Sequence, residues 1–148
     1  MTEVLFYHLT DSTLEAVLPG LVERSLARGW RAVIQTGSDE RRDALDAHLW
    51  TFQEEAFVGH GTDRDPFPAD QPVFLTCSSA NPNGAAVRFL CDGAIAGETD
   101  GYARIVVVFD GHDSAQLDGA RGQWKQLKSA GHDVTYWQQV GGRWEKKA

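Results

Sequence analysis

A short segment near the end of this chain gathers positive charge around a tryptophan. Within residues 120–131, ARGQWKQLKSAG, Arg121, Lys125 and Lys128 follow i, i+4, i+7 spacing, and Trp124 lies beside them. On a helix this spacing places the three cations in one stripe. Such a stripe beside an indole ring has the chemistry to bind a short acidic peptide that ends in a hydrophobic residue. The side chain would pack on the ring, and the cations would bind the carboxylates.

Two other interpretations fit the same residues. Single-stranded nucleic acid would stack a base on Trp124 and place its phosphates on the cations. Alternatively, the stripe is a solvated charged face, and Trp124 joins Leu117 and Leu127 in the core. Sequence spacing alone leaves this structural interpretation open.

The charge of the whole chain favours the peptide. The 148 residues include 14 Lys+Arg against 21 Asp+Glu, a formal net charge of −7, which argues against broad, nonspecific binding to nucleic acid. All four lysines nevertheless fall in the last 24 residues, and from Arg121 onward six basic residues face two acidic ones. This asymmetry predicts that one end of the molecule meets an acidic partner.

The composition is that of an ordinary soluble globular protein, with 42% hydrophobic and 24% charged residues. We expect one domain over residues 1–148, with no membrane span and no signal peptide, and therefore a cytoplasmic protein. The two cysteines, Cys77 and Cys91, lack CxxC spacing for zinc and are expected to be buried free thiols.

The motifs of nucleotide-binding and hydrolytic enzymes are absent. The sequence contains no GxGxxG, no GxxxxGK[ST], no GxSxG and no HExxH, so we expect no catalytic residues, no cofactor and no metal. A phosphate-handling enzyme that uses Arg41 and Arg42 remains a competing hypothesis. Asp63 and Asp65 could hold a divalent cation, but a solvated turn is the preferred interpretation of that segment.

Hydrophobic periodicity predicts an α/β fold with a parallel sheet. Strands are expected at 3–8, 30–36, 73–77, 85–91, 101–111 and 133–139, with Ile105 to Phe109 forming a central strand. A first helix is expected at 13–29, with Asp11 or Ser12 as its cap and a kink or break at Pro19 left open. A second helix is expected at 39–50 after a Ser38 cap, and a third from an Asp113 cap to Gly131. A long irregular loop is predicted at 51–72 and a polar tail at 141–148.

The order and spacing of several segments resemble a known family, the chi subunit of the bacterial DNA polymerase III holoenzyme, a clamp-loader accessory protein. The segments that carry the resemblance are FYHL at 6–9, ARGWRAVI at 27–34, LDAHLWTFQEEAFVGHG at 45–61, NPNG at 81–84, and VVVFDG at 106–111 followed by ARGQWKQLKSAGHDVTYWQQ. The resemblance implies a non-catalytic protein. It also implies a single-domain, three-layer, Rossmann-like α/β fold with a mostly parallel central sheet and no phosphate-binding glycine loop.

The resemblance implies two partners, with DNA contacted mainly indirectly. The first is the acidic, phenylalanine-terminated C-terminal tail of single-stranded DNA-binding protein (SSB), with Arg121, Trp124, Lys125 and, more weakly, Lys128 as its site. At Leu117 some members of the family are basic, so this pocket is expected to be less positive here.

The second implied partner is the psi subunit of the clamp loader or, in some bacteria, an iron–sulfur helicase that uses the same surface. Trp50 and Phe57, with Phe52 nearby, are the residues expected at this second surface. The alternative for these aromatic residues is burial beneath the long loop.

Overall fold

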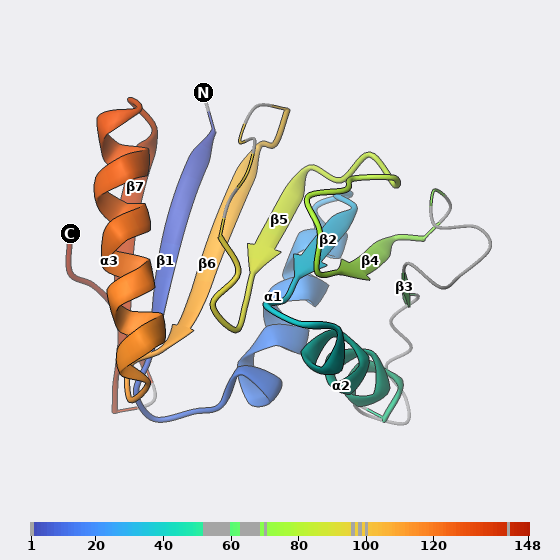
Figure 1. Ribbon diagram of the computed structural model, residues 1–148, viewed down its shortest axis with the longest axis horizontal. Helices are drawn as coiled ribbons and strands as arrows, with labels where there is room; N and C mark the ends of the chain where they lie inside the picture. The colour runs from blue at the N-terminus through green and yellow to red at the C-terminus, as the bar shows by residue number, and fades with distance from the viewer. Residues whose placement is uncertain are drawn as a thin grey trace.

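The computed structural model describes residues 2–51, 60–62, 69, 71–95, 97, 99, 101–141 and 143–148, without the side chains of residues 49–51, 60 and 61. Three helices and eight strands follow one another in the described chain (Figure 1). They are β1 (Glu3–Leu9), α1 (Leu14–Ala27), β2 (Ala32–Gln35), α2 (Asp39–Thr51), β3 (His60–Thr62), β4 (Val73–Thr76), β5 (Val87–Leu90), β6 (Arg104–Asp110), α3 (Ser114–Ser129), β7 (Asp133–Val140) and β8 (Arg143–Lys146).

The strands form one eight-stranded sheet in the order β3-β4-β2-β5-β6-β1-β7-β8. Every neighbouring pair is parallel except β7 and β8, which confirms the predicted mostly parallel α/β sheet. β6 lies between β5 and β1, and Ile105 to Phe109 are all buried, so the predicted central strand is confirmed. A strand buried on both faces reads as a continuous apolar run, as this one does.

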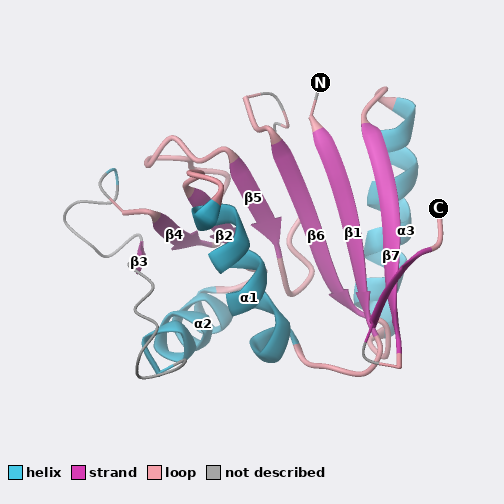
Figure 2. Ribbon diagram, turned by 180° about the vertical axis from the view of Figure 1, so that it is seen from behind, coloured by secondary structure: helices cyan, strands magenta, loops and turns pink. Residues whose placement is uncertain are grey.

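Helices cover both faces of the sheet. Figure 1 shows α3 in front of β1 and β7, and Figure 2, seen from behind, shows α1 on the opposite face. Leu18 of α1 and Leu45 of α2 share one core cluster with Ile34 and Val106, whereas Leu127 of α3 belongs to a second cluster. The arrangement confirms the expected three-layer fold.

The cap of α1 is Thr13, one residue after Ser12 and two after Asp11, the two predicted caps. The side chain of Thr13 accepts the backbone N–H of Ala16 at 3.2 Å. The backbone N–H groups of Asp11 and Ser12 instead donate to Oε1 of Gln139 in β7. Gln139 thus holds the bend at residues 10–12 outside the helix, and neither predicted cap is used.

Pro19 does not break α1, which runs uninterrupted from Leu14 to Ala27. Proline lacks the N–H that would bond the carbonyl four residues earlier, here the carbonyl of Glu15. Nε2 of His48 in α2 lies 2.6 Å from that carbonyl oxygen. The freed acceptor therefore has a partner from a neighbouring helix, and the helix continues through the proline.

The predicted polar tail is wrong as a description of residues 143–146. This segment is β8, which pairs antiparallel with β7. Trp144 of β8 packs edge-on against Tyr7 with ring centroids 4.7 Å apart and joins the core cluster under α1. One large aromatic side chain, alternating with exposed charged neighbours, turns the segment into a strand.

Two further expectations are changed by the position of residues at strand ends. Cys91 is buried, as predicted, but Cys77 is exposed because the chain leaves the sheet directly after β4. The predicted irregular segment 51–72 contains the short strand β3, which pairs parallel with β4. No helix in the described part of the chain is long and apolar enough to cross a membrane.

We predict that Trp144→Ala lowers the free energy of unfolding by about 1–2 kcal/mol, less than the cost of truncating a fully buried tryptophan. The reason is the loss of the contact with Tyr7. Chemical denaturation measures the effect, and Lys146→Ala, an exposed residue of the same strand, is the control with an expected change within about 0.5 kcal/mol. Equal stability of the two variants would contradict a structural role for β8.

Candidate functional site

The helix α3 is held at both ends by local contacts. The side chain of Asp113, the predicted cap, accepts the backbone N–H of Gln116 at 3.1 Å. The helix stops at Ala130, and Gly131 follows with φ of +89°, a conformation that favours glycine. Ala120, Gln123 and Leu127 are buried, so this stripe faces the sheet. The opposite side of α3 is left to solvent.

Trp124 lies at the boundary between the core and the exposed side of α3. Its indole is half-buried and makes edge contacts with Phe6, at a centroid distance of 5.5 Å, and with Tyr136, at 5.8 Å. The ring therefore belongs partly to the core and partly to the surface. Neither of the two sequence interpretations, full burial or a free aromatic ring, describes it completely.

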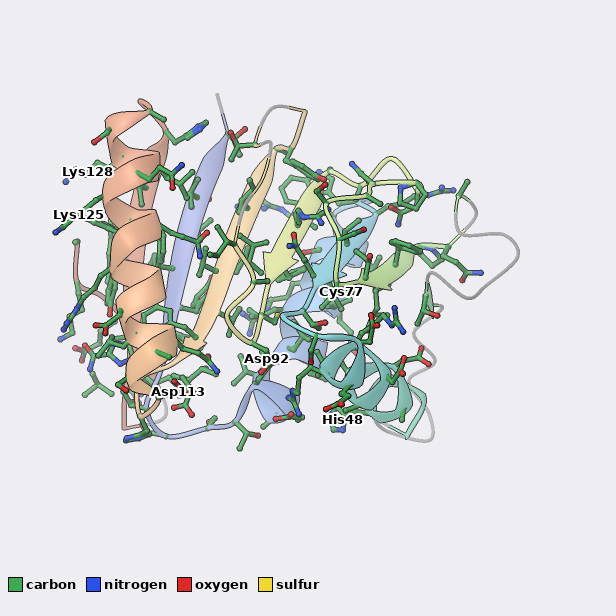
Figure 3. The ribbon with its side chains drawn as sticks, in the orientation of Figure 1. His48, Cys77, Asp92, Asp113, Lys125 and Lys128 are labelled. Atoms are coloured by element: carbon green, nitrogen blue, oxygen red, sulfur yellow. The ribbon has the colours of Figure 1, made fainter. Side chains whose placement is uncertain are left out.

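The three cations of the stripe are exposed on the same side of the helix. Nζ of Lys128 lies over the Trp124 ring, 5.4 Å from the centroid, a cation–π contact. Figure 3 shows the side chains of Lys125 and Lys128 leaving α3 away from β1 and β6. Within the described residues, the ion pair of Arg121 is a long contact with Asp118, 3.9 Å between Nη1 and Oδ1, and 68% of its side chain is exposed. The cations are thus free to bind a negatively charged ligand.

The sheet contributes two residues that the sequence reasoning did not identify, Tyr136 of β7 and His8 of β1. Their side chains are hydrogen-bonded, with 2.6 Å between the Tyr136 hydroxyl and Nδ1 of His8, and His8 stacks on Phe109 at 4.9 Å. Tyr136 lies beside Trp124, and His8 lies next to Tyr136, because β1 and β7 pair in a register that places Phe6 opposite Tyr136. Only knowledge of this register would have found them.

Charge from Arg121 reaches both of these residues. Burial, then His112 and Arg121, lowers the pKa of His8 below its usual value. Burial raises the pKa of Tyr136, and Arg121 opposes that rise. Arg121 therefore lies close enough to the Tyr136–His8 pair to act on it. We define the α3 site as Arg121, Trp124, Lys125 and Lys128 together with Tyr136.

The first turns of α3 add no positive charge to the α3 site. Leu117, at the position expected to be basic in some members of the resembling family, is partly buried against the core under α3. Asp118 is exposed and close to Arg121. The positive charge of α3 thus begins at Arg121, at the middle of the helix.

A second feature, a cavity at the carboxyl ends of the strands, occupies the position where open α/β sheets commonly bind ligands. It has a volume of about 360 Å³ and is lined by residues that include Asp110, Asp92 and Arg41. Arg41 is hydrogen-bonded to Glu15 and, at 3.0 Å, to Asp92. Burial acts to raise the pKa of Glu15, but the contact with Arg41 outweighs it and the pKa lies below its usual value.

Arg42, the other arginine of the phosphate-handling hypothesis, is buried and paired with Asp39 at 3.1 Å and Asp43 at 3.2 Å. Both arginines therefore already have carboxylate partners, and the cavity presents acidic groups to a ligand. An anionic phosphate would be repelled there. The geometry argues against the enzyme hypothesis.

The residues predicted for the second partner fall outside the part of the structure that is described. The backbone of Trp50 lies in α2, but its side chain, Phe52 and Phe57 are outside the described residues, as are Asp63 and Asp65. Among the described side chains, no group of three or more His, Cys, Asp or Glu is placed to hold a metal ion.

Comparison with known proteins agrees with the resemblance of the sequence. The family model described as DNA polymerase III chi subunit, HolC, matches residues 1–135. A protein of Rickettsia prowazekii (strain Madrid E), named "Probable DNA polymerase III subunit chi", is 31% identical over 87 residues, which cover 59% of this chain and 53% of that protein. The match thus spans about half the length of that relative. The chain belongs to the family of DNA polymerase III chi subunits.

We predict that Arg121→Ala raises the pKa of His8, because removing a nearby positive charge makes protonation of the imidazole easier. An NMR titration of the His8 ring measures the change. Lys125→Ala, which removes an exposed cation from the same helix, is expected to leave the His8 titration unchanged. Equal shifts in the two variants would show that Arg121 does not face the Tyr136–His8 pair.

Proposed function

We propose that this protein is a non-catalytic accessory subunit of DNA polymerase III whose α3 site binds the acidic, phenylalanine-terminated C-terminal tail of SSB. Membership of the chi family supports the role in DNA replication. The observation that carries the binding site is the half-buried Trp124 with Lys128 over its ring and Arg121 and Lys125 exposed on the same face. A partly exposed aromatic ring beside three exposed cations suits a ligand that has one apolar side chain with anionic groups around it.

The contacts available at the α3 site are enough for a modest affinity. The terminal phenyl ring of the peptide would pack against Trp124, worth about 1.5–3 kcal/mol. Its terminal and side-chain carboxylates would bind Arg121, Lys125 and Lys128 at about 1.5–3 kcal/mol each. These contacts sum to about 6–12 kcal/mol before the cost of association and ordering, at least about 4 kcal/mol, is subtracted. At most about 8 kcal/mol then remains, so we expect binding no tighter than micromolar.

The surroundings of Trp124 favour a peptide over single-stranded nucleic acid. The indole contacts Phe6 and Tyr136 edge-to-face, and Lys128 lies over the ring. Base stacking needs an open ring face, whereas a phenyl side chain can pack against a partly covered one. The net charge of −7 also opposes the approach of a long polyanion. In this proposal DNA is contacted mainly through SSB, in the cytoplasm.

A second partner is proposed from the family resemblance, which assigns Trp50, Phe57 and neighbouring Phe52 to the psi subunit of the clamp loader or to an iron–sulfur helicase. Exposed aromatic residues are typical anchors of protein interfaces. The backbone of Trp50 lies in the last turn of α2, an element different from those of the α3 site. One protein could then hold SSB and the clamp loader together.

Arg121→Ala is expected to weaken binding of an acidic, phenylalanine-terminated peptide at least tenfold, because about 1.5–3 kcal/mol is lost with one charge-assisted contact. Isothermal titration calorimetry measures this, and wild-type binding should weaken as salt is added. Arg143→Ala, which removes an exposed arginine from β8, is the matched control and should bind as the wild type does.

An oligonucleotide titration run in parallel separates the peptide from the nucleic-acid hypothesis. Binding of the oligonucleotide in preference to the peptide, with loss in Arg121→Ala, would establish the α3 site as a nucleic-acid surface. Unchanged peptide affinity in Arg121→Ala would show that the α3 site does not bind the peptide.

Trp50→Ala and Phe57→Ala are each expected to weaken binding of the psi subunit or the helicase at least about tenfold, because each removes an aromatic anchor. Both variants should bind the acidic peptide normally, and Arg121→Ala should bind the partner normally. Pull-down with the purified partner, together with the peptide titration, measures both effects. Loss of peptide binding in Trp50→Ala would show that the two surfaces are one.

A further inference from the structure

A second group of cations surrounds a cavity on the face of the sheet opposite α3. The cavity has a volume of about 370 Å³ and lies between α1 and the strands β1, β5 and β6. Its floor includes Tyr7, Phe89 and Val106, and its rim is formed by Arg24, Arg28 and Arg104. Figure 2 shows α1 lying over this face beside β6. We call this cavity the arginine pocket.

The positive charge of the arginine pocket is only partly neutralised by the protein. Nη2 of Arg104 pairs with Glu3 at 3.1 Å, but its Nε is buried without an acceptor among the described residues. Neither Arg24 nor Arg28 forms an ion pair within the described part of the chain. Three guanidinium groups thus share one carboxylate, and two positive charges remain for a ligand.

Structural roles account for part of this arrangement but not for all of it. Arg24 lies in the last turn of α1, where a cation is favourable beside the negative end of the helix dipole. Arg28 and Arg104 both lie over Trp30, at 4.6 and 5.3 Å from the ring centroid. These cation–π contacts hold two guanidinium groups in place, yet they add no negative charge, so the repulsion between the arginines persists.

Tyr7 connects the charged rim with the apolar floor. Burial raises the pKa of its hydroxyl, and the charges of Arg104 and Arg24 oppose that rise. Both guanidinium groups therefore lie near the Tyr7 hydroxyl, although one belongs to a helix and the other to a strand. The Tyr7 hydroxyl, with two cations nearby, can donate a hydrogen bond to an oxyanion. The apolar residues of the floor suit the less polar part of the same ligand.

We propose that the arginine pocket binds a phosphate monoester group, carried either by a free nucleotide or by the end of a nucleic-acid strand. A phosphate monoester carries about −1.5 to −2 charge at neutral pH and offers three acceptor oxygens. That charge matches the two positive charges left by Glu3, and the oxygens match donors on the arginines and Tyr7. The sugar or base would lie against the half-buried ring of Tyr7, in a cavity of the size that binds small molecules.

A single carboxylate fits the arginine pocket less well. It carries one charge and two oxygens, so it would leave one guanidinium uncompensated. An acidic peptide could supply more carboxylates, and it is therefore the alternative that the experiment must exclude. The pocket and the α3 site lie on opposite faces of the sheet, so the two binding activities can be tested independently.

Calorimetric titrations with inorganic phosphate, deoxyadenosine monophosphate, deoxyadenosine, and a short oligonucleotide with and without a 5′-phosphate test the proposal. We expect the 5′-phosphate to increase the affinity of the nucleoside or of the strand. Arg24→Gln and Arg28→Gln should each reduce this binding about tenfold, the loss of one charge-assisted contact. Both residues are exposed, so the fold should be kept.

Arg121→Gln is the matched control. It should keep phosphate binding, whereas the Arg24 and Arg28 variants should keep binding of the acidic peptide. NMR spectra of the wild type provide a readout without any variant, because phosphate should shift the signals of Tyr7 and the Trp30 indole.

The outcomes separate the sources of the phosphate. Binding of the monophosphate supports a free nucleotide, and binding of the phosphorylated strand alone supports a strand end. The proposal is overturned if no phosphorylated probe binds more tightly than the same probe without its phosphate. It is also overturned if Arg24→Gln and Arg28→Gln weaken binding of the acidic peptide and leave binding of the phosphate unchanged.

Discussion

The pairing of β1 with both β6 and β7 is the constraint on which both surfaces of this protein depend. β1 is parallel to each neighbour, so its side chains alternate between two covered faces. Phe6 points to the α3 side and supports Trp124, whereas Tyr7 points to the α1 side and lines the arginine pocket. A shift of the register by one residue would exchange the two faces and destroy both arrangements.

The same strand also couples the α3 site to its aromatic support. His8 is hydrogen-bonded to Tyr136, stacks on Phe109 and responds to the charge of Arg121. The cations of α3 therefore lie over a rigid layer of packed rings rather than over a loose surface. Because these rings are already packed, the protein loses little conformational entropy when a ligand binds at the α3 site. A low ordering cost favours the short peptide that we propose as the ligand.

Local patterns in the sequence were sufficient to predict the helices, most strands and the cation stripe. The Asp113 cap and the spacing of Arg121, Lys125 and Lys128 depend only on neighbours along the chain, and both are found in the structure. The half-buried state of Trp124 could not be predicted, because it depends on Phe6 and Tyr136, which come from two other elements.

The features that the sequence did not predict depend on contacts between distant segments. The strand β8 forms because Trp144 packs on Tyr7, and Pro19 is tolerated because His48 reaches the carbonyl of Glu15. The arginine pocket combines Arg24 of α1 and Arg28, the residue that follows this helix, with Arg104 of β6, which no spacing rule connects. Such features become visible only when the strand order is known.

The described charges are separated along the direction of the parallel strands. The separation is partial: Asp92, Asp110 and Glu15 line the cavity at the carboxyl ends together with Arg41, and Arg143 of β8 pairs with the last residue of β7. Lys125, Lys128 and the arginine pocket lie toward the amino ends, where Glu3 and Asp133 are also found (Figure 3).

An anionic ligand that approaches this protein is therefore repelled from the strand ends where an α/β enzyme would hold a phosphate. It is attracted instead to the two helical faces at the other end. Fields of this kind act over about one Debye length, roughly 8 Å at physiological salt, and raise the rate of encounter more than the final affinity. The net charge of −7 opposes the approach of polyanions to the surface as a whole, and the α3 site and the arginine pocket are the two places at which we propose that anionic ligands bind.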